Sequence, residues 1–258
     1  CPPGYQAYRR PENGCVPPDV YGILIRMKVF AISDLHLSIH TPKPMDIFGG
    51  AWDNYLDKIS ASWEARVSDE DIVLIAGDIS WAMTLEAAVP DLNYIAAFKG
   101  RKVLLRGNHD YWWMSIGSVR RTLPAGMYAV QNDCVRLGDV LLCGSRGWSD
   151  PDVKPFTADD KKIYEREQLR MRMSLEAMRA ERRPGDRVVA MIHYPPFNSR
   201  FEPSPFTALF SEFGADAVVY GHLHGRDCRV SREAVIDGIT YYLTSCDLID
   251  NEPVEIRV

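Results

Sequence analysis

The sequence lacks long apolar runs, an excess of basic residues, cysteine pairs with metal-finger spacing, and internal repeats. No apolar stretch approaches the roughly 20 residues of a membrane-spanning helix, so we expect no membrane span. The net charge of -5 argues against stable nucleic-acid binding, which depends on clustered Lys and Arg side chains that neutralise phosphates. The absence of repeats and low-complexity tracts argues against a solenoid.

Cysteine is scarce, with 6 residues in a chain of 258. Cys134, Cys143 and Cys246 lie in apolar stretches, where reduced and buried thiols are usual. An apolar patch at 20–25 is shorter than the central region of a secretory signal. These features favour a cytoplasmic protein.

Residues 1–26 differ from the rest of the chain because they are rich in Pro and Gly and carry no helical or strand periodicity. We expect them to form an appendage that is either disordered or an artefact of the chosen start site. Cys1 is also the residue type that carries lipid in processed lipoproteins, which is an alternative interpretation. The remaining residues, 27–258, are long enough for one large globular domain.

Short apolar runs alternate with longer helical patterns after residue 27. Strands are expected at 29–32, 72–75, 103–105, 128–130, 140–143, 188–192, 217–220 and 239–243, and helices at 52–67, 85–98 and 158–183. Apolar runs without strict alternation are typical of strands buried on both faces, so an α/β fold is expected, with a second sheet in the later half. Arg and Glu alternate in the last helix, which predicts a solvated face.

Polar side chains follow the first two expected strands directly. Asp34 and His36 lie two residues apart in an extended segment, so their side chains point the same way and can grip one ion. Asp78 follows the second strand, and Gly77 before it gives the backbone room for a close approach. Each of these signals is weak alone, because loop hydrogen bonds and turns use the same residues.

A more informative run, Asn108-His109-Asp110, follows the third strand and places an amide, an imidazole and a carboxylate side by side. Core packing or turn formation rarely requires these three residue types in succession.

Histidines gather in the same kind of place later in the chain. His193 follows one strand, and His222 and His224 follow the next with both rings on one side, which is a strong metal-binding pattern. Five of the 6 histidines lie in these clusters, and His40 is the exception, expected as a loop residue. Scattered core histidines would not be distributed in this way.

The motifs resemble, in order, the motif set of calcineurin-like metallophosphoesterases. They are Asp34-x-His36, Gly77-Asp78, Gly107-Asn108-His109-Asp110, His193 and Gly221-His222-x-His224. The stretches 77–81, 110–113 and 193–197 further resemble a bacterial cytosolic subgroup of predicted phosphohydrolases. The resemblance implies a four-layer αββα sandwich, in which helices flank two mixed β-sheets.

The resemblance also implies two metal ions. One would be held by Asp34, His36, Asp78 and His224, and the other by Asp78, Asn108, His193 and His222, with Asp78 as the bridge. A set of O and N ligands without thiolate suits divalent transition metals, of which we expect Mn²⁺, with Fe or Zn²⁺ as alternatives.

The expected activity is hydrolysis of a phosphomonoester or phosphodiester in a small phosphorylated substrate. Two cations about 3.5 to 4 Å apart lower the pKa of a shared water, and the resulting hydroxide attacks the phosphorus in line. By resemblance, His109 assists the leaving group, while Asp110 orients it and raises its pKa. Two alternatives remain open: a nucleotide-lipid pyrophosphatase, whose opening motif resembles 32–37, and a non-catalytic metal-bound scaffold.

Three further residues are candidates for substrate contact. Trp112 and Trp148 lie in or beside loops expected near the metals, where aromatic rings can stack on a base or hold an acyl chain. Arg146 follows an apolar strand and could clamp a phosphate with its planar guanidinium group. Core packing is the alternative for both tryptophans, and a structural ion pair is the alternative for Arg146.

Overall fold

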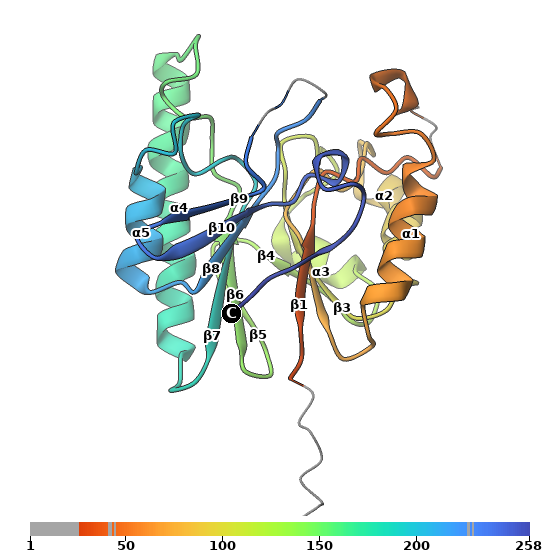
Figure 1. Cartoon of the computed structure of the whole chain (residues 1–258), viewed down its shortest axis with the longest axis horizontal. Helices are drawn as coiled ribbons and strands as arrows, with labels where there is room; N and C mark the ends of the chain where they lie inside the picture. The colour runs from red at the N-terminus through yellow and green to blue at the C-terminus, as the bar shows by residue number, and fades with distance from the viewer. Residues whose placement is uncertain (1–25, 41–42, 44, 226–227, 229) are drawn as a thin grey trace, which may run out of the picture.

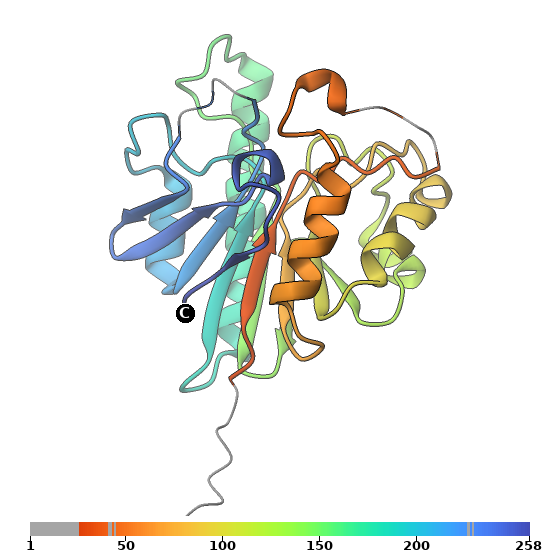
Figure 2. The same cartoon turned by 45° about the vertical axis from the view of Figure 1, so that its right-hand side comes forward.

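The computed structural model describes residues 26–40, 43, 45–225, 228 and 230–258. The predicted appendage, apart from Arg26, lies outside the described residues. Two β-sheets face each other, and helices cover the outer face of each (Figures 1 and 2). This arrangement confirms the predicted α/β fold with an αββα sandwich.

The first sheet has five strands. Their order is β11 (Val254–Glu255), β1 (Val29–Ile32), β2 (Ile72–Ile75), β3 (Arg101–Leu105) and β4 (Met127–Val130). Strands β1 to β4 are parallel, so their carboxyl ends meet at one edge, and only β11 is antiparallel among these strands. The outer face is covered by α1 (Tyr55–Arg66), α2 (Leu85–Ala96) and α3 (Ile116–Thr122), on the right in Figure 1.

The second sheet has six strands. Their order is β5 (Cys134–Leu137), β6 (Val140–Ser145), β7 (Arg187–Ile192), β8 (Ala217–Tyr220), β10 (Ile239–Leu243) and β9 (Glu233–Ile236). Strands β6, β7, β8 and β10 are parallel, while β5 and β9 pair antiparallel at the edges. Helices α4 (Ala158–Glu181) and α5 (Pro205–Phe213) cover its outer face, on the left in Figure 1. Two short 3-10 helices, η1 (Asp46–Phe48) and η2 (Cys246–Leu248), complete the elements.

The central strands β1 and β2 of the first sheet are apolar on both faces because both faces are buried. In β1, Val29 and Ala31 pack between the two sheets, whereas Phe30 and Ile32 pack against the helices. Side chains from β6, β7 and β8 meet them from the other side. The apolar layer between the sheets, called the interior layer below, explains why the strands showed no polar alternation.

The ends of the long helix follow from its sequence. Thr157 accepts from the backbone N–H of Asp160, and the Asp160 carboxylate accepts from the backbone N–H of Thr157, which is a capping box. The helix ends at Glu181, two residues before the predicted boundary of 183. No helix of the described chain is long and apolar enough to cross a membrane.

Candidate metal centre

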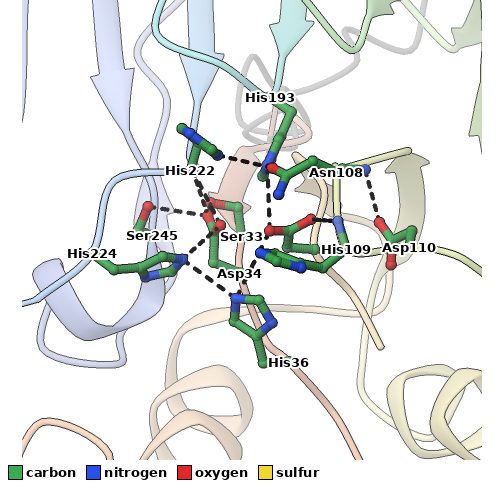
Figure 3. Close-up of polar contacts among 12 residues, drawn as sticks. Ser33, Asp34, His36, Asn108, His109, Asp110, His193, His222, His224 and Ser245 are labelled. Carbon is green, nitrogen blue, oxygen red and sulfur yellow. Dashed lines mark hydrogen bonds and ion pairs between the residues drawn. The ribbon is translucent and has the colours of Figure 1, made fainter. Parts of the chain in front are cut away.

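The seven predicted metal ligands lie together at the edge where the parallel strands of both sheets end, and all but Asp78 are labelled in Figure 3. Four follow strands of the first sheet, namely Asp34 and His36 after β1, Asp78 after β2 and Asn108 after β3, and three follow strands of the second, namely His193 after β7 and His222 and His224 after β8. The sheets are joined at this point, because the N–H of Ser33 donates to the carbonyl of Thr244 at 2.7 Å. The predicted positions therefore converge.

One group consists of Asp34, His36, Asp78 and His224, called the first group below. Each offers a ligand atom within 4.8 Å of the others, a spacing at which one metal ion could be held. The Nε2 atom of His224 lies 3.0 Å from Oδ1 of Asp34 and 3.3 Å from Nε2 of His36. Among these four, only His224 is partly exposed, so the group opens to solvent on its side.

The other group, called the second group below, consists of Asp78, Asn108, His193 and His222. Ligand atoms of Asp78, His193 and His222 lie within 4.8 Å of one another. Oδ1 of Asn108 lies 2.7 Å from Nε2 of His193 and 2.9 Å from Nδ1 of His222 (Figure 3). Asp78 belongs to both groups, as a bridging ligand must.

The donor atoms in the second group fit a bound cation. Nδ1 of His193 lies 2.9 Å from the carbonyl of Ala76, which fixes the proton of the neutral ring on that nitrogen. The Nε2 lone pair then faces the acceptor oxygen of Asn108 at 2.7 Å. Two acceptors at this distance repel each other unless a proton or a metal ion lies at the site, so the geometry suits a metal ligand pair.

The ionisation of the histidines indicates the same need for positive charge. Burial opposes charge on His193, but the carboxylates of Asp78 and Asp34 outweigh it and raise its pKa to about 9. Burial likewise opposes charge on His224, whose pKa Asp34 and Asp247 raise to about 10. The carboxylates therefore attract a cation in each group, and a metal ion would supply that charge.

The other two histidines remain neutral. Burial lowers the pKa of His36 to about 4, against the attraction of nearby carboxylates. Burial and the neighbouring His193 lower the pKa of His222 to about 4. A neutral imidazole has a lone pair available for a metal.

The backbone at the ligands is strained. Asp34, His36, Asp78 and His222 have φ values of 58°, 45°, 51° and 72°. Residues other than Gly rarely adopt this left-handed region, although Asp, Asn and His tolerate it better than most, and such conformations cluster at functional sites. The strain turns these side chains toward a common point as the chain leaves each strand.

Two glycines make the close packing possible. At Gly77 a Cβ atom would collide with the His193 ring and with the Gly107 backbone, and Gly77 also has a φ of 101°. At Gly107 a Cβ would collide with the Asp78 carboxylate. The close approach expected at Gly77 is therefore made by the neighbouring ligand loops.

We expected Asp110 to orient the His109 ring, but its carboxylate binds other groups. The buried carboxylate accepts from the backbone N–H groups of Gly107 and Ile79, at 2.8 and 2.9 Å, and from the Trp112 indole at 2.9 Å. In the described chain, Nδ1 of His109 is buried without a hydrogen-bond partner. Asp110 thus holds the two ligand loops together, and burial, aided by the charge of Asp78, raises its pKa to about 6.

The sequence-based interpretation missed Asp247, which lies just after β10. One oxygen of its carboxylate lies 3.0 Å from Nδ1 of His224, and the other accepts from the N–H of Gly225 at 3.0 Å. A carboxylate in this position fixes the ring and increases its basicity as a ligand. Ser245, in the same segment, donates to Asp34 at 3.0 Å. The signal was available, because both residues follow an expected strand.

The candidate substrate contacts have different surroundings. Trp112 is fully buried and donates to Asp110, so the structure assigns it a core role and corrects the prediction of substrate contact. Trp148 is half-buried, and its indole donates to Asp160 at 3.1 Å. Arg146 stacks on Trp148, with its guanidinium carbon 4.8 Å from the ring centre, and forms no ion pair within the described residues.

Trp81 stacks on His36, with 4.6 Å between the ring centres, and forms an aromatic wall of the first group.

Comparison with known proteins gives a family match over most of the chain. The family model described as calcineurin-like phosphoesterase matches residues 27–226. No curated protein gives a significant match.

Several solved structures are similar in fold. A protein of Thermus thermophilus is 9% identical, with a TM-score of 0.52 and coverage of 90% of this chain and 98% of the other. A phosphopantetheinyl hydrolase from Mycobacterium tuberculosis is 15% identical, with a TM-score of 0.49 and coverage of 84% and 88%. A protein of unknown function from Aquifex aeolicus is 15% identical, with a TM-score of 0.45 and coverage of 89% and 95%.

Proposed function

This chain belongs to the calcineurin-like phosphoesterase family, and we propose that it hydrolyses a small phosphomonoester or phosphodiester with two divalent transition-metal ions. The observation that supports this most directly is the convergence of two ligand groups on a shared, buried Asp78. A structural metal site would need one closed group, whereas two adjoining groups with a shared carboxylate suit phosphoryl transfer.

The residues that would hold the ions are those of the first and second groups. When bound, the two ions would activate water and offset charge on the phosphoryl group. We propose Mn²⁺, with Fe or Zn²⁺ as alternatives, because every donor is an oxygen or a nitrogen.

We assign His109 to the leaving group. Its half-buried ring lies 5.6 Å from the His36 ring and 4.8 Å from the Trp81 ring, at the margin of the first group. The backbone N–H of His109 donates to Oδ1 of Asp78 at 2.8 Å, which fixes the position of the residue relative to the shared ligand. His109 would hold the proton that the leaving oxygen takes. Asp110 is a positioning residue, since it acts through the backbone of the two loops.

The test is hydrolysis of an aryl phosphomonoester and an aryl phosphodiester, measured side by side. Protein stripped with a chelator is compared with protein reloaded with Mn²⁺, Fe²⁺ or Zn²⁺. We expect turnover of at least one ester only after reloading. Two bound ions without hydrolysis of either ester, or of the pyrophosphate below, would contradict the proposed activity and favour the non-catalytic scaffold.

One observation favours a second candidate, the nucleotide-lipid pyrophosphatase. A cavity of about 390 Å³ adjoins His222 and is lined in part by Val153, Phe197, Phe201 and Leu223. Such a surface would accommodate an apolar portion of the substrate. Adding a nucleotide-linked lipid pyrophosphate to the same assay distinguishes the candidates, because only the pyrophosphatase activity requires cleavage of a phosphoanhydride.

A further inference from the structure

A second cavity, with a volume of about 240 Å³, lies at the same edge of the sandwich and is lined by charged side chains. Four guanidinium groups line it, those of Arg106, Arg146, Arg166 and Arg170, against the single carboxylate of Glu167. The volume greatly exceeds the roughly 10–15 Å³ that one water needs, so a tetrahedral anion fits together with water. We call this space the arginine cavity.

The single carboxylate is already engaged. Glu167 is almost fully buried, and its Oε1 accepts from Arg170 at 2.6 Å. Over the described part of the chain, the side chains of Arg106, Arg146 and Arg166 form neither an ion pair nor a hydrogen bond. Nε of Arg106 is buried without any partner. Three guanidinium groups thus share one cavity with no negative group of their own.

This arrangement is unfavourable for the protein alone. The side chains of Arg106 and Arg146 are half-buried, and no ion pair within the described residues offsets their like charges. A charge that is partly removed from water and has no partner is destabilising, and proteins normally pair or remove such charges. An anion in the cavity would supply the missing partner, because guanidinium groups bind phosphate and carboxylate oxygens with two parallel hydrogen bonds.

The cavity and the metal centre are connected at two points of the chain. Arg106 directly follows β3 and lies two residues before Asn108, so their Cα atoms are at most about 7 Å apart. Arg146 directly follows β6, and its carbonyl accepts from the N–H groups of His193 and Tyr194 at 3.0 and 3.1 Å. The arginine cavity and the metal centre are therefore neighbours at this edge of the sandwich.

We propose that the arginine cavity binds a second phosphate group of the substrate, so that the preferred substrates are small molecules that carry two phosphate groups. This inference rests on the proposed function, in which the reacting phosphate lies at the metal centre. The arginine cavity would hold the other phosphate and fix the orientation of the molecule.

The test compares kcat/KM for matched substrates on the Mn²⁺-loaded enzyme. The pairs are a nucleoside 3′,5′-bisphosphate with the nucleoside 5′-monophosphate, and a hexose bisphosphate with the hexose monophosphate. We expect at least one bisphosphate to be preferred by roughly 10- to 100-fold, as expected for hydrogen bonds to a charged group. Arg146→Met and Arg166→Gln should each remove most of this preference.

A matched control is Arg172→Gln, which also removes one positive charge from α4 but breaks an exposed pair with Glu212 and a contact with the Phe213 ring, both away from the cavity. It should keep the preference of the unaltered enzyme. The proposal is wrong if the unaltered enzyme prefers neither bisphosphate, or if Arg172→Gln lowers the preference as much as Arg166→Gln does. Arg166 is exposed, so its variant tests the proposal even if Arg146→Met fails to fold.

A binding measurement separates this proposal from the proposed function. Sulfate should raise the Tm of the Mn²⁺-loaded protein in a saturable way, and this rise should be much smaller in Arg166→Gln than in Arg172→Gln. If no ester is hydrolysed but this difference is found, the proposed function fails and the anion site stands. Equal shifts in both variants would overturn the anion site.

Discussion

The two ligand groups share Asp78 but differ in charge and in what supports them. The first group contains Asp34 as well as Asp78, and its His224 contacts a further carboxylate, that of Asp247. The second group has one carboxylate, that of Asp78, together with the neutral amide of Asn108 and the rings of His193 and His222, and a backbone carbonyl holds the His193 ring. More negative charge should bind a cation more tightly, so the first group should fill at a lower metal concentration than the second.

The largest effect should come from the residue that both groups share. Asp78→Asn keeps the size of the side chain and tolerates the left-handed backbone, but it loses the charge that lies between the groups. We expect both ions to be lost and activity to fall by roughly 1,000-fold or more, because several kcal/mol of charge stabilisation are lost.

Elemental analysis after gel filtration measures the metal content of this variant. Asp34→Asn is the matched comparison, since its carboxylate belongs to the first group alone, and it should retain an ion in the second group. Two ions retained by Asp78→Asn would contradict a bridging role.

His109→Asn should lower kcat by about 100- to 10,000-fold, the usual contribution of a general acid, while both ions remain bound. This outcome would show that His109 acts in proton transfer and not in metal binding. The comparison of the two ligand groups does not address that distinction. His40→Asn is the control, because His40 is exposed and lies outside the clusters. Kinetics and metal analysis are made on the same preparations, and unchanged kcat in His109→Asn would remove the assignment.

Asp247→Asn tests the support of the first group alone. The amide can still accept from His224, but it lacks the charge that makes the ring a stronger ligand. We expect the affinity for one ion to fall by about 10- to 100-fold and the other to stay within experimental error. Calorimetric titration with Mn²⁺ resolves the two affinities, and Asp250→Asn, which only alters an exposed pair with Arg232, serves as the control.

The smallest effect concerns protons. Each group pairs one histidine of raised pKa, about 10 for His224 and about 9 for His193, with one of pKa about 4. A raised pKa means that the metal-free site holds a proton near neutral pH, which a metal ion must displace. Binding of each ion should therefore release about one proton at pH 7.5, and affinity should rise about tenfold per pH unit, until about pH 10 for the first group and about pH 9 for the second.

Calorimetry in two buffers of different ionisation enthalpy counts these protons. Asp247→Asn should reduce the release at the first group and leave that at the second unchanged. A proton count that does not depend on Asp247 would show that the two groups are not distinguished by this carboxylate.

The strands and their polar ends were the predictable part of the molecule. Runs such as β8 and β10 were predicted with their observed bounds, because a strand buried on both faces leaves a continuous apolar pattern. Strands β5, β9 and β11 were missed because they are partly exposed, so they carry no continuous apolar run. Helices α3 and α5 were also missed.

Contacts between distant segments were less predictable. Asp247 follows an expected strand, but its contact with His224 depends on the pairing of β10 with β8, which belongs to the tertiary fold. Arg166 was hidden in the alternating charges of α4, where most arginines do lie on a solvated face. Trp112 had two interpretations, substrate contact and core packing, and the structure selects the core because the ligand loop turns this side chain inward. The sequence gives the residue types, but it does not show whether a given side chain points toward the core or toward the surface.

The metal centre draws its ligands from both halves of the sandwich, and the interior layer separates those halves. Small side chains such as Ala31, Ala76 and Ala217 lie in that layer and allow the sheets to approach closely. The thickness of a completely apolar region therefore sets the spacing of charged donors at its rim. Larger side chains in the interior layer would change the spacing of the metal ligands and lower activity, although no group that touches metal or substrate is altered.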